Sequence, residues 1–342
     1  MSRDEGKSVS MKRWTIALGF AVSTLFVYLA LRGLHLEEVW RGLQEADYRW
    51  ILPGLPVYFL GVWARTWRWH YMLRSLKAIP PRRLFPVSII GYMGNNVYPA
   101  RAGEVIRAYL LRRREKVTIS SSLATIIVER VFDGLVMILF VVVSLTLTPM
   151  ALWLRRMVVL ASLLFFGALF LFFALAAGPQ KAQAMASWFV ERLLPISLRE
   201  PVEGIVGRFL AGLRFLLRGR DLGLIFAISI GIWLAETVVY WCIMQGFPFQ
   251  VPFHALMLVT GVVNLATTIP SSPGYVGTFD VPGIRVLEGF GVPGEVAASY
   301  ILVLHAALWL PITCLGFYYV WRESISWRDF GATAEETPLG TS

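Results

Sequence analysis

The sequence predicts an all-α membrane protein with six full transmembrane helices and two broken, re-entrant helical hairpins. Of its 342 residues, 56% are hydrophobic and only 16% are charged, whereas soluble domains are about one quarter charged. Apolar stretches of the length that crosses a bilayer, about 20 residues, recur along the chain. Two further apolar stretches are interrupted by polar residues, proline and glycine. Broken backbone inside a membrane survives only where protein or a wet cavity covers it.

The first half of the chain is expected to hold four of the spans and one hairpin. The spans are 14–34, 51–73, 118–148 and 152–177, and the hairpin is 84–112. No small-residue cleavage site follows the first span, so we expect an uncleaved first helix rather than a signal peptide.

The second half is expected to hold spans 222–245 and 295–320 and a hairpin at 254–290. Loop 178–220, between the halves, combines arginines with aromatic residues at helical spacing. It is predicted to be amphipathic and either to lie on the anionic lipids of the inner leaflet or to pack on the bundle as a connecting helix. Residues 1–330 would then form one polytopic domain, followed by a disordered tail, 331–342.

Charge sets the predicted orientation. Segments 74–83 and 112–116 are strongly basic, whereas loop 35–49 carries four acidic residues against two arginines. The positive-inside rule places the basic segments, and with them both termini, on the cytoplasmic side of the cell membrane. The two span–hairpin–span units then have opposite orientations, which is the inverted repeat of many transporters. The alternative is that the glycine and proline breaks occur by chance.

The net charge of +10 raises the question of a nucleic-acid partner. Because the basic residues flank apolar spans, topology explains this charge better and no nucleic-acid partner is expected. The two cysteines lie within apolar spans and are expected to be small apolar residues rather than a disulfide framework. The oligomeric state stays open.

Each hairpin carries asparagine, then proline, then glycine, then a carboxylate at its break. The residues of the first break are Asn95, Asn96, Pro99, Arg101, Gly103, Glu104 and Arg107. Those of the second are Asn264, Pro270, Pro273, Gly274, Gly277 and Asp280. A break exposes the N-terminus of a half-helix, whose free N–H groups and positive dipole end favour a phosphate group. We therefore interpret both segments as parts of a substrate-binding site.

Further charged residues fall inside the apolar helices, where each costs at least ~2.5–3.5 kcal/mol to insert. Arg101, Glu104 and Arg107 are spaced three apart and are expected to share one helix face. The others are Glu129, Arg130, Asp133, Glu236 and His305. One interpretation is a midplane cavity whose arginines meet an anionic group while its carboxylates orient them or exchange protons. The other is that acids and bases neutralise one another and lock the bundle.

Arg65 and Arg68 lie among tryptophans near the expected cytoplasmic end of span 51–73. We interpret them as snorkelling residues that stack on those rings, with recognition of a lipid headgroup at the inner leaflet as the alternative.

Catalytic patterns are absent from the sequence. It contains no metal-binding spacing of Cys and His, no HExxH, no GxSxG and no P-loop. We therefore expect no catalytic residue, metal or cofactor and no enzymatic activity. Two rival functions stay open. One is a membrane-embedded transferase acting on a lipid phosphate, with Mg²⁺ on its carboxylates. The other is a non-transporting scaffold that docks partners through loop 178–220.

These motifs resemble the lysylphosphatidylglycerol synthase transmembrane-region family, also called the flippase-like domain family. The resemblance covers roughly residues 14–322. It rests on Asn96-x-x-Pro99-x-Arg101-x-Gly103-Glu104-x-x-Arg107, on Glu129-Arg130-x-x-Asp133 and on Pro270-x-x-Pro273-Gly274-x-x-Gly277-x-x-Asp280. It implies movement of a phospholipid or lipid-linked headgroup between leaflets. Some members carry a soluble aminoacyl-transferase domain after the membrane region. This sequence shows none, so we do not expect it to make lysylphosphatidylglycerol.

Two residues depart from the family pattern. Asp280 stands where the family tends to have Glu, which keeps the charge on a shorter side chain. His305 stands where the family tends to have Arg. Histidine has an unperturbed pKa near ~6.5, so a permanent cation in the second half is in doubt.

Overall fold

The computed structural model describes residues 35–323 except 75, 99–100, 149–150, nearly all of 151–218, and 269–272. Within these residues the chain is helical and has no strand. The predicted spans 14–34 and 152–177, most of loop 178–220, the tail 331–342, and Pro99 and Pro270 lie outside the described residues.

Helix bounds agree closely with the long apolar stretches. The helices are α2 (Leu36–Glu45), α3 (Ile51–Leu73), α4 (Pro81–Val97), α5 (Ala102–Glu115), α6 (Ile119–Leu147), α10 (Gly219–Met244), α11 (Phe253–Ala266), α12 (Asp280–Gly289) and α13 (Gly294–Arg322), with 3₁₀ turns η1 (Tyr48–Trp50) and η2 (Pro273–Tyr275). By length and apolar composition, Leu222–Met244 and Gly294–Arg322 are clearly able to cross a membrane. The predicted spans 51–73 and 118–148 are each one continuous helix.

The two predicted hairpins are each a pair of helices that pack against each other across a break. The first pair is α4 and α5, and the second is α11 and α12. A proline at the first position of α4 starts that helix with a fixed φ. Tyr98, with extended backbone, follows its last residue.

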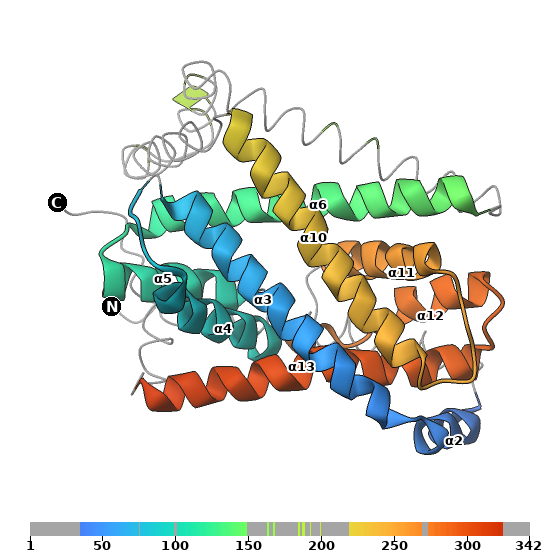
Figure 1. The fold of residues 1–342 in the computed structure, drawn as a ribbon. Coiled ribbons are helices and arrows are strands. Elements are labelled where there is room, and N and C mark those ends of the chain that lie inside the picture. The colour runs from blue at the N-terminus through green and yellow to red at the C-terminus, as the bar shows by residue number, and fades with distance from the viewer. Residues whose placement is uncertain are drawn as a thin grey trace.

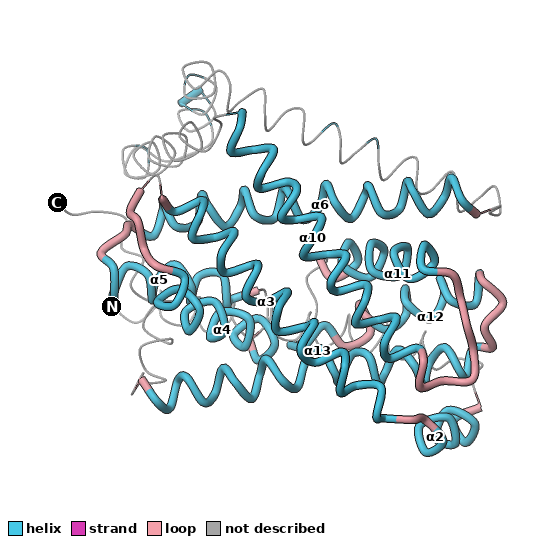
Figure 2. Tube along the Cα trace, viewed as in Figure 1, coloured by secondary structure: helices cyan, strands magenta, loops and turns pink. Residues whose placement is uncertain are grey.

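Packing in one half is repeated in the other. Helices α3 and α10 lie side by side through the middle of the molecule (Figure 1). Their directions are opposite, because the backbone N–H of Asp47, before α3, donates to the carbonyl of Gly246, after α10. Helix α6 packs on α11, and α13 packs on α4 in the same way. The tube view shows the first hairpin and the second at opposite ends of this central pair (Figure 2).

The two largest clusters of buried apolar residues each join the helices of one hairpin to their neighbours. The larger joins α10, α11, α12 and α13, with Leu256, Leu287 and Leu304 fully buried. The smaller joins α3, α4 and α5 to the end of α13, around Trp69 and Leu110. Tyr98, beside the first break, packs against the smaller cluster, and Tyr275, in the second break, packs against the larger.

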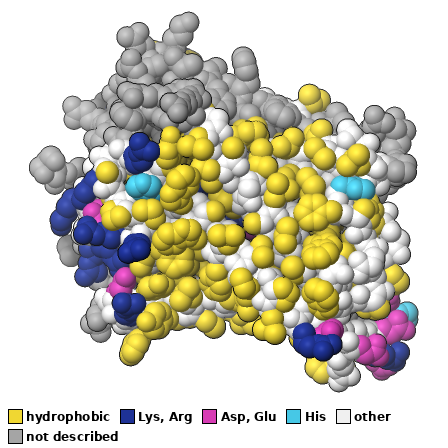
Figure 3. All heavy atoms as spheres, in the orientation of Figure 1, with side chains coloured by type: hydrophobic (Ala, Val, Ile, Leu, Met, Phe, Trp, Pro, Cys, Tyr) yellow, Lys and Arg dark blue, Asp and Glu magenta, His cyan; other side chains and the backbone are white. Residues whose placement is uncertain are grey.

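Charges gather at the two ends of the visible face, separated by a broad apolar surface (Figure 3). The basic end includes the loop before α4 and the end of α5, where Lys77 lies 2.9 Å from Glu115. The hydrogen bond from Lys77 lowers the pKa of the Glu115 carboxyl. The acidic end contains α2, which begins with Glu37 and Glu38. This separation of charge is what a protein crossing a bilayer requires.

Candidate functional site

A cavity of about 180 Å³ lies where the two breaks meet. Helices from both halves supply its walls. Its lining residues are Tyr58, Val62, Arg65, Tyr92, Asn95, Asn96, Arg101, Arg130, Asp133, Trp233, Glu236, Asn264, Thr267, Tyr275, Phe279, His305, Leu308, Trp309 and Ile312. The residues among them that the sequence singled out for this cavity are Asn95, Asn96, Arg101, Arg130, Asp133, Glu236, Asn264 and His305.

Arg101 connects the two breaks. It precedes α5 in a left-handed conformation, with φ of 54°, which is uncommon for a residue other than glycine. Its guanidinium donates to the carbonyl of Thr267, just after α11, at 3.1 Å and lies 5.8 Å from the ring centre of Tyr275. Its distance to Glu104 is 3.8 Å, and its Nε has no hydrogen-bond partner among the described residues. Arg101 thus brings a positive charge to the cavity wall, which it lines.

The second break is held by Asp280 and His305. Asp280 accepts the backbone N–H of Gly277 at 2.7 Å, and its other oxygen lies 2.8 Å from Nδ1 of His305. Nε2 of His305 lies 2.8 Å from the carbonyl oxygen of Gly274. At Gly274, φ is +74° and a Cβ would lie 2.8 Å from the indole nitrogen of Trp309. Both the backbone conformation and the space therefore require glycine there.

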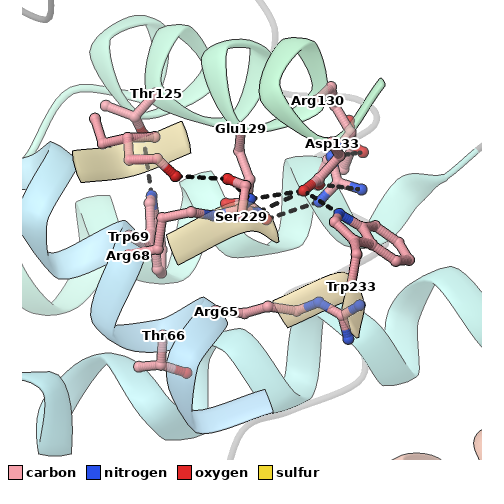
Figure 4. A network of polar contacts seen from close by, with 12 residues as sticks. Arg65, Thr66, Arg68, Trp69, Thr125, Glu129, Arg130, Asp133, Ser229 and Trp233 are labelled. Carbon is pink, nitrogen blue, oxygen red and sulfur yellow. Dashed lines mark hydrogen bonds and ion pairs between the residues drawn. The ribbon is translucent and has the colours of Figure 1, made fainter. Parts of the chain in front are cut away.

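Glu129 and Asp133, one turn apart on α6, form a buried ion-pair network (Figure 4). Glu129 is fully buried and lies 3.1 Å from Arg107 and 2.7 Å from Arg130. Asp133 accepts from Arg68 at 2.6 Å and from the indole N–H of Trp233 at 2.9 Å. The network crosses from α5 and α6 to α3 and α10, so it joins the two halves.

The snorkelling interpretation is wrong for Arg68, which is fully buried. Besides Asp133, it donates to the hydroxyl of Ser229 on α10 at 2.6 Å. Arg65 pairs with Glu236 and lies over the ring of Trp233, at 4.8 Å from its centre, as a lining residue of the cavity. Helix α3 packs against α10 and α6, so its arginines pair with acids on those helices, Glu236 and Asp133, inside the protein.

Other predicted residues support the cavity from behind. Arg107 packs on the ring of Trp69, 4.1 Å from its centre, and does not line the cavity. A Cβ on Gly103 would lie 1.8 Å from the carbonyl oxygen of Gly91, so this glycine lets α4 and α5 touch. Pro273 begins the turn η2. Glu104 lies 3.6 Å from Arg130.

The asparagines have unequal roles. Asn96 donates to Thr313 of α13 at 2.8 Å, so it joins the first break to the second half. Asn264 donates to the carbonyl of Thr260 within its own helix at 2.8 Å. The side-chain oxygen of Asn95 is buried and has no partner among the described residues.

Sequence reasoning favoured snorkelling over headgroup recognition for Arg65, which lines the cavity, and it did not assign the aromatic residues of the cavity wall. A signal for Arg65 was present: the span 51–73 contains two arginines and no acid. A buried charge needs a partner, so these arginines required acids on other helices, and Glu236 was an unpaired acid on another span. The tyrosines and tryptophans gave no comparable signal because aromatic residues are frequent throughout the chain.

Charged groups on the cavity wall favour an anion. Three arginines face it, Arg65, Arg101 and Arg130, against the two carboxylates of Asp133 and Glu236. The Nε atoms of Arg101 and Arg130 lack hydrogen-bond partners among the described residues. Guanidinium groups bind phosphate and carboxylate through paired N–H donors. A phosphate-bearing group fits this wall chemically.

A metal ion has less support in the cavity. Among the described residues, the group with three closely spaced metal-ligating side chains is His35, Glu38 and Glu295, at the acidic end and outside the cavity. Asp133 and Glu236 both accept hydrogen bonds from arginines, which leaves little capacity to ligate a cation.

A family model described as the lysylphosphatidylglycerol synthase TM region matches residues 16–316. The chain belongs to this family. The prediction from the sequence motifs is therefore confirmed. The match includes both breaks and the helices that carry the buried charges.

Proteins similar to this chain include UPF0104 membrane proteins and a glycosyltransferase. The chain is 26% identical to a UPF0104 membrane protein of Methanothermobacter thermautotrophicus, over 90% of this chain and 92% of the relative. A second such protein of that organism is 24% identical over 82% and 87%. The chain is also 25% identical to glycosyltransferase AglD of Haloferax volcanii, over 89% of its own length and 54% of the relative's.

Proposed function

We propose that this protein moves a phosphate-bearing lipid headgroup between the leaflets of the cell membrane. The observation that carries the proposal is Arg101, which lines the cavity and donates from its guanidinium to the carbonyl of Thr267 at the opposite break. Arg130 lies on the same wall. The headgroup occupies the cavity beside these arginines, and its acyl chains stay in the bilayer. Membership of a membrane family supports a membrane-embedded site.

The proposed route uses alternating access. Six spans and two re-entrant hairpins form an inverted repeat, with both termini cytoplasmic. The repeated packing of α6 on α11 and of α13 on α4 supports this arrangement, as do the opposite directions of α3 and α10. In such transporters the substrate site lies near the midplane, where broken helices of both repeats meet. The hairpins open the cavity to one side at a time. Anionic lipids of the inner leaflet gather at its basic end.

Arg101→Ala tests the proposal directly. The full chain is reconstituted in liposomes with labelled phospholipids or lipid-linked sugars, and movement between leaflets is measured. Arg101→Ala removes the cation that faces the headgroup, so lipid movement is expected to fall to the protein-free rate. Arg49→Ala is the matched control, because its exposed side chain pairs with Asp47 outside the cavity.

Comparison of these variants separates the outcomes. Loss of movement in Arg101→Ala, with wild-type rates in Arg49→Ala and equal melting temperatures, supports the assignment of the site. Normal transport by Arg101→Ala would contradict it. If verified, folded wild type moved no lipid of the panel, the flippase proposal itself would fail.

A membrane-embedded transferase is the second candidate, and the relative named as a glycosyltransferase favours it. We propose that this chain is not an enzyme, because the two carboxylates of the cavity wall, Asp133 and Glu236, already accept hydrogen bonds from arginines. Turnover of a lipid phosphate that depends on a divalent metal would favour the transferase. A scaffold that docks partners through loop 178–220 is the third candidate. It predicts that alanine substitutions in the cavity have no effect while changes in the loop do.

A further inference from the structure

The ring of His305 lies between two hydrogen-bond acceptors of the second break. Its Nδ1 is 2.8 Å from a carboxylate oxygen of Asp280, and its Nε2 is 2.8 Å from the carbonyl oxygen of Gly274. The other oxygen of Asp280 accepts the backbone N–H of Gly277. The ring therefore joins α13 to the turn η2 and to the first residue of α12.

If both contacts of the ring are hydrogen bonds, they set the number of protons that the pair holds. A carbonyl oxygen only accepts, so Nε2 of His305 must donate to Gly274. A neutral imidazole has one N–H, which leaves Nδ1 with a lone pair. Nδ1 can then bond Asp280 only if a second proton is present, either on Nδ1 or on the carboxyl group. Both forms contain one proton more than a neutral histidine beside an ionised aspartate.

We infer that His305 and Asp280 form a proton-binding site and that the proton is the ion coupled to lipid movement. The proton site is inferred from the geometry alone. The coupling of that proton to lipid movement rests on the proposed function. The proton enters from the cavity, which His305 lines, and returns to it. No other bond is made or broken.

Loss of the proton changes the break mechanically. If Nε2 keeps its N–H, the lone pair of Nδ1 faces the ionised oxygen of Asp280 at 2.8 Å. If Nδ1 keeps it, the lone pair of Nε2 faces the carbonyl of Gly274. Two lone pairs at this distance repel, so one contact is lost in either case. The ring then releases either the start of α12 or the turn η2, whose Tyr275 has a φ of 60°.

The surroundings link the proton to an anion. Five charged side chains from other elements line the same cavity: Arg65, Arg101, Arg130, Asp133 and Glu236. Three tyrosines also line it, Tyr58, Tyr92 and Tyr275, and the ring of Phe279 covers His305 with 4.4 Å between centres. The three arginines outnumber the two carboxylates, so these five side chains give the wall an excess positive charge. A bound phosphate cancels that charge and favours the proton, and this coupling is reciprocal.

The proton site is tested without any lipid movement. The full chain with ¹⁵N-labelled histidine is studied in nanodiscs, and the variants His305→Gln and Asp280→Asn assign the signals. We expect either a ring with both nitrogens protonated or a protonated carboxyl infrared band that Asp280→Asn removes. The signal of His254, which lies outside the cavity, is the internal control. A singly protonated ring together with an ionised Asp280 at neutral pH would overturn the inference.

The coupling is tested in liposomes with the membrane potential clamped at zero. One proton per lipid and a gradient of one pH unit give about a tenfold difference in labelled lipid between leaflets, because one unit is worth about 1.4 kcal/mol. His305→Arg keeps the cation opposite Asp280 but cannot release its proton. It is expected to show no such difference, whereas His254→Gln behaves as wild type.

Negative results in the two experiments have different consequences. Lipid movement by wild type that ignores the pH gradient would overturn the coupling. If wild type moves no lipid at all, the proposed function fails, and the proton count alone decides whether the site exists.

Discussion

Glu129 shows how a single residue can hold four helices of this protein together. Its buried carboxylate on α6 lies within 3.4 Å of Arg68 on α3, of Arg107 on α5 and of Arg130. Arg68 also bonds Ser229 on α10. Charges out of water persist only where ion pairs and hydrogen bonds compensate them. The sequence left open whether this cluster was structural or functional, and the full burial of Glu129 favours a structural role for that carboxylate.

Glu129→Gln tests this role. The change preserves the size of the side chain but removes the charge that compensates buried arginines, so we expect the free energy of unfolding to fall by about 3–5 kcal/mol. Denaturation in mixed micelles measures the loss.

Glu288→Gln is the matched control, because Glu288 pairs with Arg285 on a more exposed face of α12, at 2.8 Å. Exposed pairs contribute at most ~1 kcal/mol. Equal losses in the two variants would show that burial does not set the contribution of Glu129.

Residue spacing predicted several residues of the site but not the direction of every side chain. Arg101, Glu104 and Arg107 were expected on one helix face, but the structure turns Arg101 to the cavity and Arg107 toward Trp69. The reason is local: Arg101 has left-handed backbone and precedes α5, so helical spacing does not govern its direction. A helical sequence pattern does not predict a left-handed residue. The position of Arg101, on which the proposed function depends, was therefore not predictable from spacing.

At the scale of elements, hydrophobic length was a reliable guide. The predicted spans 51–73 and 118–148 end within one residue of α3 and α6. The sequence predicted where along the chain the breaks occur but not their backbone conformation. Their shapes depend on positive φ angles at Arg101, Gly274, Tyr275 and Gly277, and on contacts with elements distant in the sequence. Such contacts are tertiary, so a local pattern does not contain them.

Contact between the helices of the first hairpin depends on Gly103. A Cβ there would lie 1.8 Å from the carbonyl oxygen of Gly91 and 2.7 Å from the backbone nitrogen of Asn95. These are backbone atoms, so α4 and α5 must separate to admit a methyl group. We expect Gly103→Ala to lower the free energy of unfolding by at least ~1–3 kcal/mol, the usual cost of overpacking.

Gly61→Ala is the control for that substitution. Gly61 lies within α3, and a Cβ there meets nothing within 4 Å. Alanine is the better helix former by about 0.5–1 kcal/mol, so Gly61→Ala is expected to be neutral or stabilising. Denaturation of both variants gives the comparison. If Gly103→Ala matched Gly61→Ala in stability, the close packing of α4 on α5 would be contradicted.

The whole molecule combines repeated packing with opposite charge at its two ends. The first hairpin starts near the basic end and the second near the acidic end, and both breaks reach the same cavity (Figures 1 and 3). An inverted repeat accounts for all three features, because it brings one hairpin from each side of the membrane to a common midplane site. The sequence suggested this arrangement through charge and element order. It could not show that the breaks meet, because that depends on how the helices pack.

The proposed inverted repeat makes a prediction about the side of the membrane on which each end of the molecule lies. Single cysteines are placed at Arg112, at the basic end, and at Glu37, at the acidic end, after replacement of the native Cys242 and Cys314. Both target side chains are exposed, so each reacts with a membrane-impermeant maleimide only from its own side. The positive-inside rule predicts that Arg112→Cys is labelled in inverted vesicles and Glu37→Cys in right-side-out vesicles. Lipid transport by both variants serves as the control for correct folding. Labelling of both cysteines from the same side would exclude the proposed topology, because the two hairpins could then not enter from opposite faces.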